Sequence, residues 1–204
     1  MQTKTYAELF LLIQALSGVI FATGELGRIK ALINRRALRA FRSTNYWPRF
    51  LKIGENRVVT SNVVPYTELG LDSIDTYLRI HRQAPWLTSA VQEYDIMVTA
   101  DGATLVAGSG NPTEAFVTYK KQFSDTFGDA QGESTAIPAE WFQYMAHGTY
   151  ADYLRAEGQQ EKAALADQEA DMLLQEEMIR IDEQHTLQMV SNRIFTNANM
   201  QMRY

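Results

Sequence analysis

The sequence contains no cysteine, which excludes several classes of site at once. None of its 204 residues can form a disulfide, a thiolate metal ligand or a cysteine nucleophile. The three histidines, His81, His147 and His185, lie on separate predicted elements, and none has a second histidine at metal-ligand spacing. We therefore expect no metal site and no cofactor.

Long hydrophobic runs are also missing. The longest apolar stretch, residues 9–21, is interrupted by Gln14, Ser17 and Gly18, and it is shorter than the roughly 20 residues of a membrane span. Lys4 is the only basic residue before it, and no small-residue cleavage pattern follows, so we expect no signal peptide. The net charge of -5 argues against a general affinity for nucleic acid or anionic membranes.

Sequence signatures of catalysis are absent as well. The chain has neither a GxSxG nor an HExxH motif. The glycine-rich stretch at 108–112 lacks the Lys-Ser/Thr of a phosphate loop, and it is better interpreted as a turn. Glu176 and Glu177 are adjacent, so on a helix they point to different sides and form no catalytic dyad. We expect that the protein is not an enzyme.

Apolar residues at helical spacing are the main structural signal. They predict helices over residues 6–21, 25–43, 139–156 and 159–185, and a short one at 72–80. A small β-insertion is predicted at about 94–123, where apolar and polar residues alternate and Asp101-Gly102 separates two runs. The expected fold is mainly α: a helical bundle with a small β-insertion and an extended C-terminal tail.

The last nineteen residues differ from the rest of this acidic chain. Residues 186–204 contain no acidic residue and are rich in apolar side chains, Asn and Gln. The Asn197-Ala198-Asn199 stretch is a poor continuation of a helix. We therefore expect a helical domain at 1–185, which includes the β-insertion, followed by a C-terminal docking tail at 186–204. The alternative is that this segment packs back on the bundle and extends the last helix.

Charge is segregated between two predicted helices. Helix 25–43 places four arginines on one stripe opposite its apolar face: Arg28, Arg35, Arg39 and Arg42. The segment 159–183 carries eight acids, among them Glu169, Glu176 and Glu177. Both faces could simply be solvated. Alternatively the two helices meet, within one chain or between neighbouring copies, and their ion pairs set register and partner choice.

The order of these elements resembles one known family over nearly the whole chain. The pieces are "IKALINRRALRAFRSTNYWP", the "VVPY" link, "IDTYLRIHRQAP", a β-insertion ending in "AFVTYKKQF", "IPAEWFQYMAHGTYADYLRAEGQQEKAALADQEADMLLQEE" and the tail "SNRIFTNANMQMRY". In this order they are similar to the head-to-tail adaptor, or connector, proteins of tailed bacteriophages. No single motif is an invariant signature, and the β-insertion is the part that varies most in that family.

The resemblance implies a structural virion protein in the neck between head and tail, assembled in the cytoplasm of a bacterial host. It implies a ring, usually of twelve copies, that continues the DNA channel without reading its sequence and involves no membrane. The implied partners are further copies, the portal protein, and a tail nozzle or other tail protein.

The same resemblance assigns roles to three sets of residues. The implied portal-binding tail includes Arg193, Ile194, Phe195, Met200, Met202 and Tyr204. The implied charge between subunits or toward the channel includes Arg28, Arg35, Arg39, Arg42, Glu169, Glu176 and Glu177. The implied loops toward a tail partner include Asp101, Gly102 and Ser109, unless the β-insertion only caps the bundle.

Two other functions remain open at this stage. The first is a DNA-binding or packaging accessory protein that uses the arginine-rich helix 25–43. Its binding would weaken steeply as salt rises, because phosphate contacts release counterions. The second is a hydrolase with a buried pair of carboxylates, which would require shifted carboxyl pKa values in a cleft.

Overall fold

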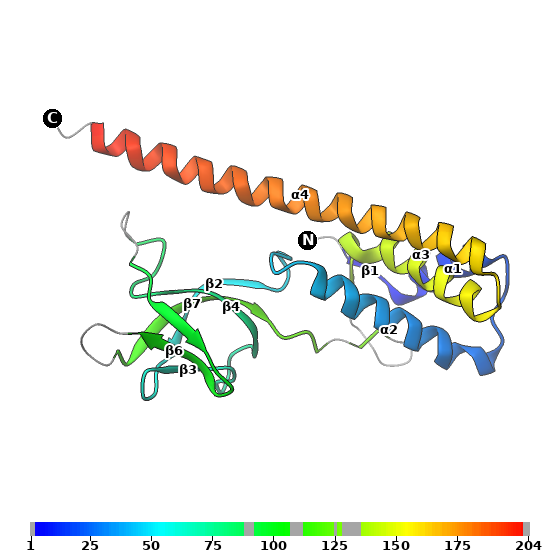
Figure 1. Ribbon diagram of the computed structural model, residues 1–204, viewed down its shortest axis with the longest axis horizontal. Coiled ribbons are helices and arrows are strands. Elements are labelled where there is room, and N and C mark those ends of the chain that lie inside the picture. The colour runs from blue at the N-terminus through cyan, green and yellow to red at the C-terminus, as the bar shows by residue number, and fades with distance from the viewer. Residues whose placement is uncertain (1–2, 88–91, 107–111, 125, 128–135, 202–204) are drawn as a thin grey trace. The chain divides into compact units, whose positions relative to one another are not determined.

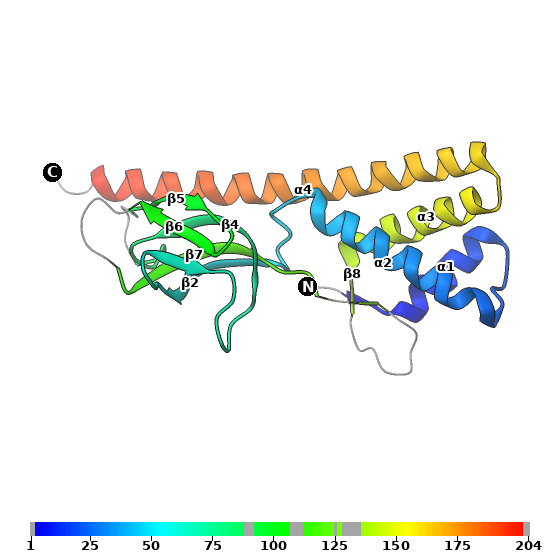
Figure 2. The ribbon, with the colours of Figure 1, turned by 60° about the horizontal axis from the view of Figure 1, so that its bottom comes forward.

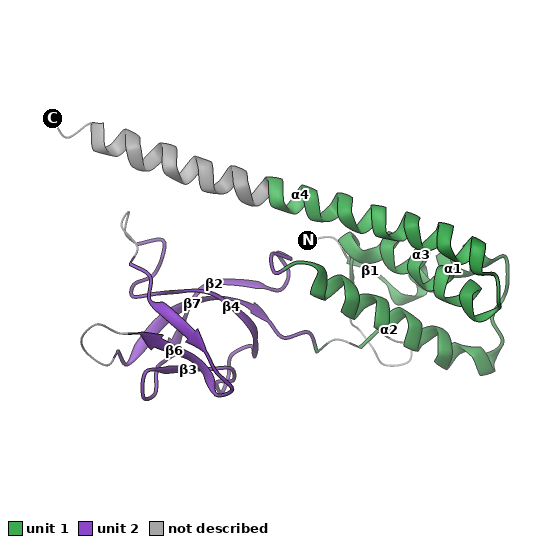
Figure 3. Ribbon diagram, viewed as in Figure 1, with its two compact units in different colours: residues 1–44, 124–187 green, residues 45–123, 188–204 purple. Residues whose placement is uncertain are grey.

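The chain divides into two compact units (Figure 3). A computed structural model describes all residues except 1–2, 88–91, 107–111, 125, 128–135 and 202–204, and it describes no side chains from residue 184 onward. The helical unit comprises Met1–Thr44 and Ser124–Leu187, and the β unit comprises Asn45–Phe123 with Gln188–Tyr204. The helical unit is therefore assembled from two separate stretches of sequence.

Four helices and one 3-10 turn are seen in the described residues (Figure 1). They are α1 (Tyr6–Ser17), η1 (Thr23–Glu25), α2 (Leu26–Ser43), α3 (Ala139–Ala156) and α4 (Gln160–Gln201). The four α-helices begin within one or two residues of the positions that the apolar spacing predicts. Thr5 caps α1 by accepting from the Glu8 backbone N–H, while Glu8 accepts from the Thr5 backbone N–H. Gly18 ends α1 in the left-handed region, at φ 67°.

The apolar faces of the helices form the core of the helical unit. α3 packs against both α1 and α2, and α4 approaches α3 through small side chains at Ala163 and Ala166, which lie against Ala151 and Leu154. Short strands β1 (Thr3–Lys4) and β8 (Ile137–Pro138) pair antiparallel, so the first residues are fixed to the start of α3. The fully buried core side chains include Leu9, Ile13, Ile29, Ile33, Trp141 and Met145.

The β unit contains two antiparallel three-stranded sheets. The first has the order β2-β7-β4, with β2 (Leu51–Val58), β7 (Glu114–Lys121) and β4 (Ile74–His81). The second has the order β3-β6-β5, with β3 (Val63–Pro65), β6 (Gly102–Val106) and β5 (Asp95–Val98). Both sheets supply one apolar cluster, and the two views show them against one another (Figures 1 and 2).

Two tight turns reverse the chain direction in the β unit. Ser61 and Asn62 both adopt positive φ, and Thr60 and Val63 exchange backbone hydrogen bonds across them, as in a two-residue hairpin turn. The predicted hairpin around Asp101-Gly102 is confirmed, because β5 and β6 pair antiparallel on either side of it.

The expected fold class was wrong. In the described residues, eight strands in three antiparallel sheets accompany the four helices, so the protein is not a mainly-α bundle. The short helix predicted at 72–80 is absent, because strand β4 (Ile74–His81) covers most of that segment. The cause is two register shifts in the pairing of β4 with β7, because extra residues at bulges change the two-residue alternation of a strand. Ile74, Tyr77 and Ile80 are consequently buried at three-residue spacing, which imitates a helix.

The extended C-terminal tail was also a wrong prediction. Helix α4 continues through the segment and ends at Gln201. Residues 186–201 contain neither Gly nor Pro, and adding a residue to an existing helix is far easier than starting one, so two Asn residues do not stop it. Within the described part of the chain, no helix combines the length and the apolar character that crossing a membrane requires.

Candidate functional site

A buried arginine joins the three long helices of the helical unit. Arg36 lies on the apolar face of α2, between Ile33 and Ala40, and its side chain is 4% exposed. Its Nε and Nη2 atoms each donate to one carboxylate oxygen of Asp152 on α3, both at 2.8 Å. A paired fork of this kind fixes orientation as well as distance.

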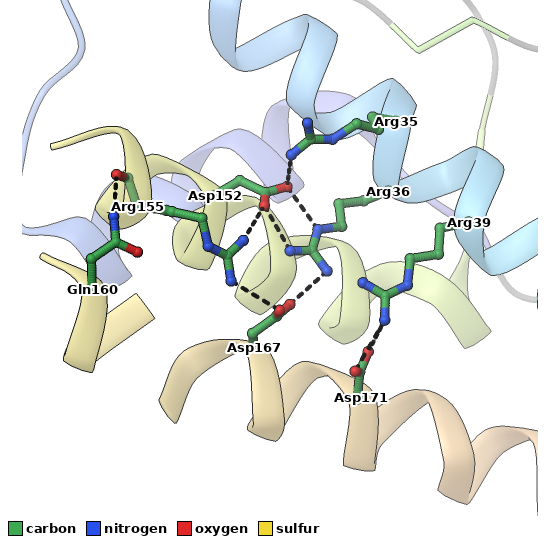
Figure 4. Close-up of polar contacts among 8 residues, drawn as sticks. All are labelled: Arg35, Arg36, Arg39, Asp152, Arg155, Gln160, Asp167 and Asp171. Carbon is green, nitrogen blue, oxygen red and sulfur yellow. Dashed lines mark hydrogen bonds and ion pairs between the residues drawn. The ribbon is translucent and has the colours of Figure 1, made fainter. Parts of the chain in front are cut away.

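Two further residues complete the ion-pair clamp, defined as Arg36, Asp152, Arg155 and Asp167 (Figure 4). Arg36 Nη1 lies 2.8 Å from Asp167 Oδ1 on α4. Arg155 bridges the two carboxylates, at 3.0 Å from Asp152 and 3.1 Å from Asp167. Each carboxylate thus contacts both arginines of the clamp, and the clamp connects α2, α3 and α4 around buried charge.

A glycine makes room for the clamp. A Cβ atom at Gly148 on α3 would lie 2.9 Å from Arg36 Cδ and 3.0 Å from its Nε. These atoms cannot move aside easily, because the guanidinium is held by Asp152. Gly148 therefore permits the arginine to lie directly across α3, at the expense of helix propensity.

The clamp keeps its carboxylates ionised. Burial alone would raise the pKa of Asp152, but hydrogen bonds from Arg36 and Arg35 outweigh it and lower that pKa. Burial opposes the shift of Asp167 too, and its pKa is lowered by the charge of Arg36 and by bonds from Arg36 and Arg155. Burial likewise opposes protonation of Arg36, yet Asp152 raises its pKa above the usual value. The charged forms of all three groups are stabilised together.

Beside the clamp, α2 and α4 border an open groove of about 600 Å³. Its apolar side chains are Leu38, Leu174 and Met178. Its polar lining is mainly basic and includes Arg35, Arg39, Arg42, Ser43, Asp171 and Gln175. The groove therefore combines an apolar floor with a positively charged border.

Three of the four stripe arginines are ion-paired within the chain. Arg28 contacts Glu157 at 3.8 Å, Arg35 contacts Asp152 at 2.8 Å, and Arg39 contacts Asp171 at 3.1 Å. The Arg39 pair confirms that the basic and acidic helices meet inside one chain. Arg42 is exposed, borders the groove, and has no ion pair with a described residue.

The acidic residues singled out in the sequence lie apart from the clamp. Glu169 contacts His147 at 3.3 Å, and Glu177 pairs with Arg180 on the same helix. Glu176 is exposed and has no ion pair with a described residue. These three side chains form no common centre.

The clamp itself was missed by sequence reasoning. The predicted basic stripe contains only arginines that lie opposite the apolar face of α2. Arg36 lies on the apolar face, so it was not part of that stripe. The available signal was an arginine placed three residues after Ile33 and four before Ala40, inside the apolar stripe. Asp152 gives the same signal, since it follows the buried Thr149 and Ala151 and precedes Leu154 on α3.

The predicted loop and tail residues have different outcomes. Asp101 is exposed, whereas Gly102 is buried, and a Cβ there would lie 2.1 Å from the Val64 carbonyl oxygen. Gly102 is thus a pairing position of β6 and is not an exposed tip. Ser109 lies outside the described residues. The side chains of the predicted portal-binding set also lie outside them: Arg193, Ile194, Phe195, Met200, Met202 and Tyr204.

The β unit holds a second buried arginine, Arg57, whose side chain is fully buried. Its Nη2 atom lies 2.7 Å from Glu55 Oε2 and donates to the Asp72 carbonyl oxygen at 2.5 Å and to the Tyr119 hydroxyl. Burial and the hydrogen bond to Glu55 raise the pKa of Tyr119. The Nε and Nη1 atoms of Arg57 have no hydrogen-bond partner among the described residues.

Neither arrangement offers evident reaction chemistry. The clamp carboxylates each contact at least two arginines, and their pKa values are lowered instead of raised toward those of a general acid. Among the described residues, no group of three or more His, Asp or Glu side chains could hold a metal ion. In comparisons with known proteins, no family model matches the chain, and no curated protein has a significantly similar sequence.

Proposed function

We propose that the chain is a structural subunit of a virion neck, forming a ring that connects a portal to a tail and continues the DNA channel. The observation that carries this proposal is the internal pairing of the basic stripe. Arg28, Arg35 and Arg39 each face a carboxylate of the same chain. Each pair joins α2 to a carboxylate on another part of the helical unit, as in a scaffold subunit, and a phosphate would have to compete with that carboxylate.

The clamp supports the same proposal from another direction. It spans three helices around a buried charge network, and removing one partner of such a network is costly, so the helices keep one arrangement. A ring subunit must hold its contact surfaces in fixed relation to one another. In this proposal the loops near Asp101 face a tail protein, and residues 186–204 contact the portal.

Native mass spectrometry tests the proposal with portal rings purified from the virus that encodes the chain. We expect the full-length protein to add to the ring in one fixed multiple, twelve in the family that the sequence resembles. A version ending at His185 should not add, because it lacks residues 186–204. If the full-length protein does not bind and remains monomeric at every concentration used, the proposal is wrong.

A second candidate function, a DNA-binding accessory protein, rests on Arg42 and Arg35. Arg42 has no ion pair with a described residue, and the Arg35 side chain is 65% exposed despite its contact with Asp152. Fluorescence anisotropy with duplex DNA at two salt concentrations separates the candidates. Binding that falls steeply with salt, and falls further in Arg42→Gln, would favour the DNA-binding function. The structural proposal expects weak binding with no dependence on Arg42.

A further inference from the structure

The solvent face of α4 carries an unusual line of large apolar side chains. Leu165, Met172 and Ile179 follow one another at seven-residue intervals, and they are 69%, 51% and 59% exposed. Seven residues are close to two helical turns, so the three side chains form one stripe. The stripe lies opposite the buried face of α4, which is formed by Ala163, Ala166, Ala170, Leu174 and Ile181.

Acidic residues accompany this apolar stripe at a constant offset. Glu169, Glu176 and Glu183 each follow a stripe residue by four positions, which places them on the same side of the helix. All three are exposed. Two copies of this face laid against each other would bring like charges together, which disfavours pairing. A surface that is basic as well as apolar therefore fits the stripe better than a second stripe does.

The groove between α2 and α4 has that complementary character. Leu38 and Met178 supply apolar lining, and Arg39 and Arg42 supply positive charge. Arg35, Arg39 and Arg42 recur at spacings of four and three residues, so the positive charge runs along α2 as the negative charge runs along α4. Both surfaces lie on the helical unit, which the clamp holds together.

We propose that the apolar stripe of one copy docks into the α2–α4 groove of the next copy. The stripe and the groove use different faces of α4, so the contact is heterologous, and a bound pair still offers one free stripe and one free groove. Contacts of this type close into a ring or continue as a filament. The inference rests on the proposed ring function and names the contact between its subunits.

Complementary defects provide the test. Met172→Glu places a charge in the stripe and leaves the groove intact, whereas Leu38→Glu places a charge in the groove and leaves the stripe intact. Both positions are exposed, so both variants should fold, which circular dichroism and thermal melting check. Leu11→Glu on α1 is the matched control, because Leu11 is an exposed apolar residue outside both surfaces.

Sedimentation velocity of the full chain gives the readout. We expect concentration-dependent self-association of the wild type and of Leu11→Glu, weakened roughly tenfold or more in each of the other variants. An equimolar mixture of Met172→Glu and Leu38→Glu should form a 1:1 heterodimer and nothing larger, because only one intact stripe and one intact groove remain to meet. Wild-type association should also weaken as salt rises.

Three outcomes would overturn the inference: a wild type that stays monomeric at all concentrations, variants that assemble like the wild type, or a mixture without a heterodimer. The portal experiment separates this failure from failure of the proposed function. If Met172→Glu adds to portal rings in the same multiple as the wild type, the ring function holds and this subunit contact is wrong. If neither adds, the ring function itself fails.

Discussion

Each unit of the chain buries one arginine, and the two side chains are stabilised differently. Arg36 in the helical unit meets two carboxylates that come from α3 and α4. Arg57 in the β unit meets one carboxylate, from Glu55 on its own strand, and otherwise a carbonyl and a hydroxyl oxygen. Two of its nitrogens have no hydrogen-bond partner among the described residues.

The difference concerns what each arginine connects. The charge of Arg36 is balanced by groups far away in the sequence, so the balance exists only when three helices are packed. The charge of Arg57 is balanced by a residue two positions away, so much of it persists whenever the strand forms. The charge balance of the buried arginine thus depends on tertiary packing in the helical unit and on a near neighbour in the sequence in the β unit.

The substitution with the largest expected effect on this difference between the two arginines is Asp152→Asn. The substitution leaves Arg36 buried without its bidentate carboxylate, and we expect it to lower the free energy of unfolding by about 3–5 kcal/mol. Urea denaturation followed by far-UV circular dichroism measures the loss. Glu157→Gln, which removes the exposed carboxylate near Arg28, is the control and should cost less than about 1 kcal/mol. Equal effects of the two changes would contradict the clamp.

Arg57→Met should cost less, about 1–2 kcal/mol. The change removes a charge whose hydrogen bonds are incomplete, and the Tyr119 hydroxyl can still donate to Glu55, as it does at 2.5 Å. The same denaturation experiment provides the comparison. A loss for Arg57→Met larger than that for Asp152→Asn would reverse the conclusion drawn about the two arginines.

Acid should weaken the helical unit through the clamp. The pKa values of Asp152 and Asp167 are lowered by folding, so their contribution is fully present above their unfolded pKa of about 4. It is lost as pH falls from there through the folded values, at up to about 1.4 kcal/mol per pH unit for each group. Stability measured between neutral and acid pH should show a shallower decline in Asp152→Asn than in the wild type. Parallel declines would exclude the clamp as the cause.

The smallest expected effect is that of Gly148→Ala. The new Cβ crowds Arg36, and we expect a net loss of about 1 kcal/mol after the gain in helix propensity is included. In an Arg36→Met background the side chain is no longer held by Asp152 and can move away from the new Cβ, so the loss should turn into a gain of about 0.5–1 kcal/mol. This change of sign, measured by thermal or urea denaturation, identifies the contact. Equal effects in both backgrounds would show that the two residues are not coupled.

The helices of the helical unit could be predicted because their apolar spacing is regular. Ile29, Ile33, Ala37 and Ala40 follow one face of α2 and are all buried. The hairpin at Asp101-Gly102 could be predicted because the turn residues and the strand alternation agree. Each of these patterns lies within one short segment of the sequence. It can therefore be recognised without knowing which other segments pack against that segment.

The rest depended on contacts between distant segments. Strand β4 was misread because bulges in its pairing with β7 set the burial of Tyr77 and Ile80. The clamp was missed because the charge of Arg36 is compensated only by residues on other helices. The end of α4 was misplaced because Asn197 and Asn199 are weak stop signals inside an already formed helix.

The two-part construction of the helical unit has a consequence for the order of synthesis. Arg36 and Asp152 are 116 residues apart in the chain. At ordinary translation speeds, Asp152 is synthesised on the order of ten seconds after Arg36. All strands of the two three-stranded sheets lie between residues 51 and 121, so they are complete before Asp152 has been made. The strands of the two sheets are therefore made as one uninterrupted stretch, whereas the contact between Arg36 and Asp152 cannot form until the second stretch of the helical unit has been synthesised.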